Sequence, residues 1–411
     1  MRGLRGQLSK VATLVAGSGA QLLSNAAAAL LATLWLTPQD RGVMVVCMTV
    51  ASIVGLTASF GIGNVYRSRL PRASGLGHGE DLRRTYSATA ATCVVAAAAL
   101  SFAGMLVLTQ TGAGQGVTAS YLAVTILSAV VQTAQILVVE ARFATGHFIA
   151  GSRWAAVAAL GGFAALALAG VLGATGSVLL GAQAGVSGVV LLSATLAAAR
   201  AGSLQFRRTS PRAVADFIRH GTASMGLSLG IVVMSRTDRL FLAAFATPAT
   251  VAVYALGVTL AELLRLVPTA VGQLLTQKVA EGTVWATVFR TQVLTGLATM
   301  VLGGVGSVLA WFLIPFVFGD EYAGARVVVV IMVLGEIAYA FLVLATRGLI
   351  GGGWSRPASI IGCVAVAVAL PLYALAASAG GVLGTAWGRV GVSVLTAVAA
   401  SGRLRRQLTS T

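Results

Sequence analysis

Seven charged side chains fall deep inside long apolar segments in the second half of the chain. They are four arginines and three acids: Arg236, Asp238, Arg239, Glu262, Arg265, Glu336 and Arg389. Because a charge in lipid is costly, such residues face the interior of a helix bundle or a watery cavity. If the three acids are ionised and each pairs with one arginine, one arginine has no acidic partner. The planar guanidinium group of such an arginine can donate two parallel hydrogen bonds to a phosphate. We therefore predict an anion-binding site at these four arginines, with Arg265 and Arg389 nearest the middle of the membrane.

The three acids have two possible roles. Asp238, Glu262 and Glu336 can pair with the arginines and so hold the helices together. Alternatively, one of them can carry a proton or another cation during transport, as buried acids do in many membrane proteins. The sequence leaves both roles open.

Local spacing places some of these charges beside one another. Residues three apart share a helix face, so Arg236 lies beside Arg239 and Glu262 beside Arg265. Pro268 follows Glu262 by more than one turn, and we expect it to kink the helix or to free a backbone carbonyl there.

The first half of the chain has no charge deep in its apolar segments and carries uncharged polar residues instead. We predict that they form hydrogen bonds between helices or contact a sugar. The candidate sugar contacts are Gln21, Asn25, Asn64, Gln132 and Gln135. The sequence contains no nucleophile–base pair, no phosphate-cradling glycine loop and no His or Cys pair with metal-ligand spacing. We therefore expect no enzyme activity, no cofactor and no metal.

Composition defines the class of protein that positions these residues. Of 411 residues, 57% are hydrophobic and 9% are charged, and the mean hydropathy is +0.91. A soluble chain has about 25% charged residues, so a soluble enzyme and a disordered protein are excluded. The net charge of +17 comes from dispersed residues, whereas nucleic-acid binding needs a clustered basic face. We expect no nucleic-acid partner.

Twelve apolar segments are each long enough to cross a bilayer as a helix. They span about 11–36, 43–66, 85–109, 117–141, 153–173, 176–199, 219–245, 249–276, 286–317, 325–350, 357–378 and 381–402. The segment 286–317 is overlong, and we expect it to tilt or to end at Pro315. The predicted fold is an all-α polytopic membrane protein of about 12 transmembrane helices.

A weak internal repeat divides these segments into two halves. A shift of 210 residues places Thr37-Pro38 on Thr247-Pro248. We predict six-helix halves at 1–199 and 219–411, the second with a basic C-terminal tail, joined by a cytoplasmic connection at 200–218 around a central cavity. Most basic loop residues lie on the side of the N-terminus, which predicts that both termini are cytoplasmic.

Four stretches carry a resemblance to a known family. They are Gly17-Ser18-Gly19-Ala20-Gln21, Thr37-Pro38-Gln39-Asp40-Arg41-Gly42, Thr237-Asp238-Arg239-Leu240-Phe241-Leu242 and Val251-Ala252-Val253-Tyr254-Ala255, in which Ala252 replaces a usual glycine. Together with the twelve segments, they resemble the oligosaccharide-lipid flippases (O-antigen and polysaccharide) of the multidrug/oligosaccharidyl-lipid/polysaccharide exporter superfamily.

This resemblance implies a function in the bacterial cytoplasmic membrane. Such a protein moves a polyprenyl-diphosphate-linked oligosaccharide outward by alternating access during cell-surface polysaccharide biosynthesis. Its partners would be that lipid-linked substrate, membrane lipids and a glycan polymerase or glycosyltransferases. Two alternatives stay open: a drug/cation antiporter of the same superfamily, and a polyprenyl-linked glycan ligase or glycosyltransferase.

Overall fold

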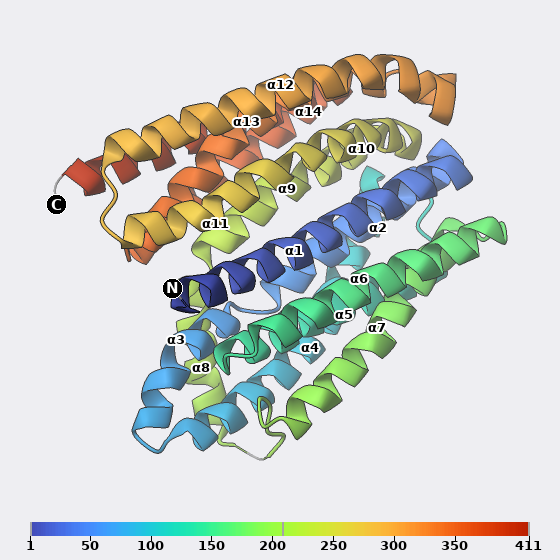
Figure 1. Cartoon of the computed structure of the whole chain (residues 1–411). Coiled ribbons are helices and arrows are strands. Elements are labelled where there is room, and N and C mark those ends of the chain that lie inside the picture. Colours follow the sequence, from blue (N-terminus) through green and yellow to red (C-terminus); the bar gives the residue numbers. More distant parts are fainter. Residues whose placement is uncertain (1, 208, 410–411) are drawn as a thin grey trace. The chain divides into compact units, whose positions relative to one another are not determined.

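The computed structural model describes residues 2–207 and 209–409, with the side chains of residues 19–71, 73–207 and 209–409. Gly17 and Ser18, which belong to the first stretch of the family resemblance, lie outside the described side chains. The described residues form helices joined by turns (Figure 1). The predicted all-α fold is confirmed. The chain divides by its contacts into two compact units, and each is described by itself.

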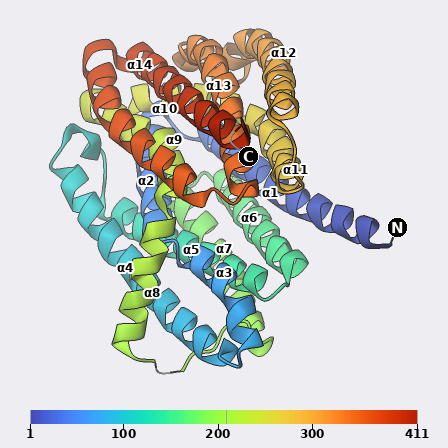
Figure 2. The ribbon, with the colours of Figure 1, turned by 90° about the vertical axis from the view of Figure 1, so that its left-hand side faces the viewer.

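Unit 1 comprises Met1–Ala32, Cys47–Gln110 and Val117–Met225. It contains most of α1 and α2 and all of the following six helices. Their bounds are α1 Arg2–Trp35, α2 Pro38–Thr57, α3 Ile62–Gly75, α4 Gly79–Thr109, α5 Ala119–Ala144, α6 Phe148–Val171, α7 Gly176–Arg200 and α8 Pro211–Ser224. The short helix α8 lies beside α3 and α4 (Figure 2). Its Phe217 is buried edge-on against Tyr86, which stacks on Tyr66.

Unit 2 comprises Thr33–Val46, Thr111–Gly116 and Gly226–Thr411. It therefore includes the turn between α1 and α2 as well as the second half of the sequence. Its elements are η1 Gly112–Gly114, α9 Gly226–Phe245, α10 Pro248–Glu262, η2 Leu263–Arg265, α11 Leu266–Ala280, α12 Trp285–Phe318, η3 Asp320–Tyr322, α13 Ala325–Gly351 and α14 Ser355–Thr409.

Every one of the twelve apolar segments falls on a helix or on a helix run. In the described part of the chain, nine helices or helix runs are long and apolar enough to cross a membrane, or ten if α8 and α9 form one bent span. The last two segments share the 55-residue α14, which is broken at Gly381 with φ 52°. Of the two alternatives for the overlong segment, the end at Pro315 is wrong, because α12 continues to Phe318. Gly319 ends it, with φ 84° and its N–H bonded to the carbonyl of Pro315.

The repeated Thr-Pro sequence has a structural meaning. Thr37 Oγ1 accepts from the backbone N–H of Asp40 at 3.2 Å, and Thr247 Oγ1 accepts from that of Thr250 at 3.4 Å. In both places the threonine caps a helix and proline occupies its first position. The two copies thus begin α2 and α10 in the same way.

Two features of unit 2 position its polar interior. A Cβ added to Gly362 of α14 would lie 2.1 Å from the carbonyl oxygen of Gly226 of α9, so these helices cross where neither has a side chain. Farther along, the helix that starts at Pro248 tightens into the 3₁₀ turn η2 before Pro268. Proline has no N–H for the carbonyl four residues earlier, which is that of Leu264. The expected distortion at Pro268 is therefore present, and Glu262 and Arg265 lie at it.

Candidate functional site: an ionic cluster inside unit 2

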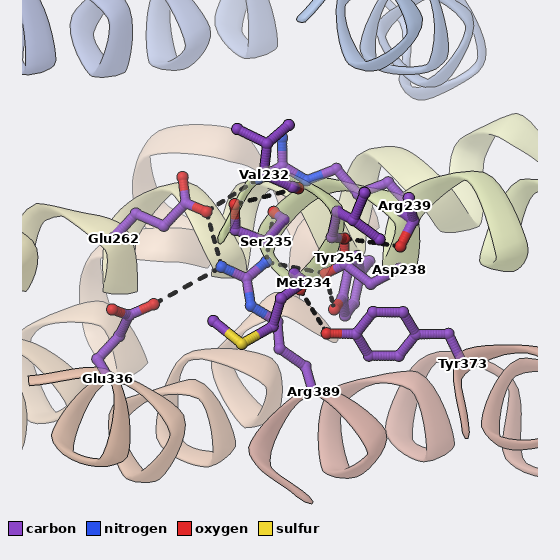
Figure 3. A network of polar contacts seen from close by, with 12 residues as sticks. Val232, Met234, Ser235, Asp238, Arg239, Tyr254, Glu262, Glu336, Tyr373 and Arg389 are labelled. Carbon is purple, nitrogen blue, oxygen red and sulfur yellow. Dashed lines mark hydrogen bonds and ion pairs between the residues drawn. The ribbon is translucent and has the colours of Figure 1, made fainter. Parts of the chain in front are cut away.

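Six of the seven deep charges meet through direct contacts in the interior of unit 2. They come from four elements that are distant in the sequence: α9, the break between α10 and α11, α13 and the second part of α14. Figure 3 shows how the side chains of Asp238, Arg239, Glu262, Glu336 and Arg389 converge. We call these residues, together with Arg236 and Arg265, the ionic cluster.

Arg389 is the most highly connected residue of the ionic cluster. Its Nη1 donates to Asp238 Oδ2 at 2.8 Å and to the carbonyl oxygen of Ser235 at 3.4 Å. Its Nη2 donates to Glu262 Oε1 at 2.7 Å and lies 3.7 Å from Glu336 Oε1. The side chain is 3% exposed, so a single buried guanidinium joins α9, α10, α13 and α14.

Arg265 forms the second strong pair. Its Nε and Nη2 donate to the two carboxylate oxygens of Glu336, each at 2.7 Å. Its guanidinium carbon also lies 4.2 Å from the centre of the Tyr339 ring, a cation–π contact. The bidentate geometry and the ring fix this guanidinium in one orientation.

Glu262 is shared by three guanidinium groups. Besides the close contact with Arg389, its Oε1 lies 3.4 Å from Nη2 of Arg239 and 3.4 Å from Nη1 of Arg265. These two longer contacts are weaker. Within the described residues, the buried Nε of Arg239 has no hydrogen-bond partner. Arg239 is thus only loosely paired.

Two tyrosines, which the sequence reasoning did not select as site residues, complete the cluster. Tyr254 donates its hydroxyl to Asp238 Oδ2 at 2.6 Å, and Tyr373 donates to the carbonyl oxygen of Met234 in the turn of α9 before Asp238. Tyr339, also missed, follows Glu336 by three residues, and this helical spacing could have identified it. No spacing rule links Tyr254 or Tyr373 to Asp238, because they lie on other helices.

Arg236 is the exception among the four arginines. It lies on α9 three residues before Arg239 and is half-buried. Among the residues that the structure describes, no carboxylate lies within 4 Å of it and its side chain makes no hydrogen bond. The arginine that the sequence tally left over is therefore Arg236, whereas Arg265 and Arg389 are the best-paired members.

The uncharged polar residues of the first half lie in unit 1. Gln21, Gln132 and Gln135 are half-buried, and Asn25 and Asn64 are exposed. None of these five side chains makes a hydrogen bond to the described residues. Within the described part of the chain, they therefore do not link helices by hydrogen bonds.

The chemistry of the ionic cluster is that of its charges. Four positive and three negative charges leave it with one net positive charge. Within the described side chains no group of three His, Cys, Asp or Glu residues could hold a metal ion. The chemistry that this arrangement supports is electrostatic attraction of an anion, with guanidinium groups as donors.

The comparisons with known proteins identify the fold. No protein-family model and no curated protein matches the chain. Among solved structures, the lipid II flippase MurJ in an inward closed conformation matches with a TM-score of 0.73 and 11% identity, over 95% of this chain and 87% of that one. An inward-facing multidrug resistance MATE family transporter of the MOP superfamily matches with a TM-score of 0.70 and 12% identity, over 95% of both chains. The eukaryotic MATE transporter AtDTX14 matches with a TM-score of 0.66 and 14% identity, over 99% of this chain and 100% of that one. This chain is thus a polytopic membrane protein with the fold shared by MATE transporters and MurJ.

Proposed function

We propose that this protein is a flippase that moves a polyprenyl-diphosphate-linked oligosaccharide outward across the cytoplasmic membrane by alternating access. The fold supports a transport role, because its solved neighbours are named as transporters and a flippase. Among these neighbours, MurJ is named for a lipid-linked cargo, lipid II. Cytoplasmic termini and a glycan polymerase or glycosyltransferase as partner belong to the same proposal.

The proposal rests on the pairing of the three deep acids with arginines. Asp238, Glu262 and Glu336 each have a guanidinium nitrogen at 2.7–2.8 Å. A cation carrier needs an acid that is free to bind its ion, whereas an anion carrier needs a free cation. The ionic cluster offers Arg236 without a partner, which favours an anionic cargo such as a diphosphate.

The geometry also ranks the predicted ligands. Arg236 would meet the diphosphate first, and the loosely held Arg239 on the same face of α9 would join it. Arg265 and Arg389 were expected from the sequence as the most direct ligands. In our proposal they contribute positive charge and orient the acids, because each already donates two hydrogen bonds of 2.7–2.8 Å to carboxylates. The free amides of unit 1, such as Gln132, are proposed contacts for the glycan.

A drug/cation antiporter is the second candidate, and two observations favour it. The fold is equally that of MATE transporters. In addition, Asp238 Oδ1 is buried without a hydrogen-bond partner among the described residues, so one oxygen of this acid is open to a proton or cation. The antiporter hypothesis predicts that Asp238, rather than Arg236, governs ligand binding.

A binding experiment separates the two functions. The purified protein in detergent is mixed with undecaprenyl diphosphate or with undecaprenol, and the midpoint of thermal unfolding is measured. A ligand that binds only the folded state raises this midpoint. We expect a rise with the diphosphate and none with the alcohol. Arg236→Ala should abolish the rise, and Arg236→Lys should retain part of it.

The matched control is Arg290→Ala, which removes an exposed arginine at the start of α12. It should respond to undecaprenyl diphosphate as the wild type does. An equal response in Arg236→Ala and the wild type would contradict the assignment of Arg236. A rise with organic cations that Asp238→Asn abolishes, without any response to the diphosphate, would establish the antiporter instead.

A further inference from the structure

The guanidinium of Arg389 is enclosed by oxygen atoms of the protein itself. Its two terminal nitrogens face carboxylate oxygens of Asp238 and Glu262 at 2.8 and 2.7 Å and the carbonyl oxygen of Ser235 at 3.4 Å (Figure 3). A third carboxylate, that of Glu336, lies 3.7 Å away. We call the oxygens of Ser235, Asp238 and Glu262 the oxygen cage.

The oxygens of the cage lie on α9 and α10, whereas Arg389 lies on α14. Asp238 is fully buried and is held by the hydroxyl of Tyr254, while Glu262 is placed by the helix break before Pro268. An acid buried in this way without a positive partner is strongly destabilising. Glu262 keeps two longer guanidinium contacts, to Arg239 and Arg265, whereas Arg389 is the one cation within 4 Å of Asp238 among the described residues. Asp238 therefore requires a cation at the centre of the cage.

Arg389 is also poorly suited to receive a cargo. A guanidinium that binds a passing anion must turn donors toward it, and both terminal nitrogens of Arg389 already face acceptors. The side chain is 3% exposed, in contrast to the half-buried and unpaired Arg236. Arg389 is thus surrounded as a bound cation is, and not as a side chain that binds an anionic cargo.

We infer that Arg389, on α14, is a tethered cation which permanently fills a cation site made by oxygens of α9 and α10. Without that side chain, the oxygen cage becomes a binding site for a free planar monovalent cation of the guanidinium class. A corollary is that Asp238 and Glu262 need no external cation to keep these helices together. The inference is independent of the identity of the cargo.

Chemical rescue tests this role. Arg389→Ala is purified in detergent, and its thermal unfolding midpoint is followed while guanidinium chloride is added to about 10 mM, since denaturation by this salt acts over molar concentrations. We expect a midpoint below that of the wild type, rising with the logarithm of guanidinium concentration as for any ligand of the folded state. The wild-type midpoint should not rise.

Three controls make the rescue specific. Urea, the uncharged analogue of guanidinium, and choline chloride, which matches the ionic strength, should produce no rise in Arg389→Ala. Arg236→Ala removes an arginine that has no carboxylate partner and should not respond to guanidinium. The triple variant Asp238→Asn, Glu262→Gln, Arg389→Ala, which neutralises the oxygen cage, should not respond either.

Two outcomes would overturn the inference. The first is a rise of the same size with urea or choline. The second is the absence of any guanidinium response in Arg389→Ala. If the alanine variant does not accumulate as folded protein, the milder Arg389→Gln takes its place, and the absence of a response there would overturn the inference equally. A failed diphosphate response at Arg236 would leave this result untouched, so the two proposals fail separately.

Discussion

The two units differ in the polar groups that they contain: unit 2 buries paired charges, whereas unit 1 has a partly exposed ion pair and neutral amides. Unit 2 holds an ionic cluster with side chains such as Asp238 and Arg389 at 0% and 3% exposed. In unit 1, the comparable pair between helices is Arg67–Glu140, with side chains that are 44% and 23% exposed. The residues predicted to contact a sugar in unit 1 are uncharged, and their side chains make no hydrogen bond to the described residues. Among the described residues, the deep charges of unit 2 are thus mostly paired, whereas the predicted sugar contacts of unit 1 are neutral and unbonded.

The largest expected effect comes from the same change made in each unit. Arg265→Ala leaves Glu336 buried without its bidentate partner and should lower the free energy of unfolding by about 3–5 kcal/mol. Arg67→Ala removes a partly exposed, solvent-screened pair and should cost about 1 kcal/mol or less. Thermal unfolding in detergent measures both. Equal losses would contradict the difference between the units.

The double variant Arg265→Met, Glu336→Leu sharpens this comparison. Replacing both members of a buried ion pair with apolar side chains is often neutral or stabilising, so this variant should unfold close to the wild type. A double variant as unstable as Arg265→Ala would mean that the pair contributes through its shape or its other contacts, such as Tyr339, rather than through its charges.

A second pair of changes compares hydrogen bonds from tyrosine. Tyr254→Phe removes a donor from the Asp238 carboxylate, whereas Tyr86→Phe in unit 1 removes a donor from the backbone carbonyl of Leu137 at 2.7 Å. Hydrogen bonds to charged groups contribute about 1.5–3 kcal/mol and neutral ones about 1 kcal/mol. Tyr254→Phe should therefore be the more destabilising in the same unfolding measurement. The reverse order would show that Asp238 does not rely on this donor.

The smallest expected effect on stability lies at the free amides of unit 1. Gln132→Leu and Asn64→Leu break no hydrogen bond, so each should change the free energy of unfolding by less than about 0.5 kcal/mol. If these amides contact the glycan, both variants should nevertheless slow translocation of a lipid-linked oligosaccharide in proteoliposomes. Loss of stability without loss of transport would instead assign them a structural role.

Hydropathy was sufficient to predict the membrane-spanning elements, because every bilayer-crossing segment must be long, apolar and helical. Charge counting also predicted that one arginine would be left over. It could not tell which one, since pairing depends on how α9, α10, α13 and α14 pack, and that packing relies on features such as the Gly226–Gly362 crossing. The sequence reasoning favoured Arg265 and Arg389 by depth in the membrane, a quantity that says nothing of partners. Tyr254 could not be predicted either, because its contact with Asp238 joins two helices and depends on how they pack.

Mass spectrometry of the lipids that co-purify with the protein tests whether the unpaired Arg236 holds an anionic lipid-linked cargo. The wild type is compared with Arg236→Ala and with Arg290→Ala, each purified in the same way from cells that make the glycan. We expect a polyprenyl-diphosphate-linked oligosaccharide on the wild type and on Arg290→Ala, and its depletion from Arg236→Ala at unchanged folded yield. Equal amounts of that lipid on all three proteins, or its absence from the wild type, would show that Arg236 does not hold such a cargo.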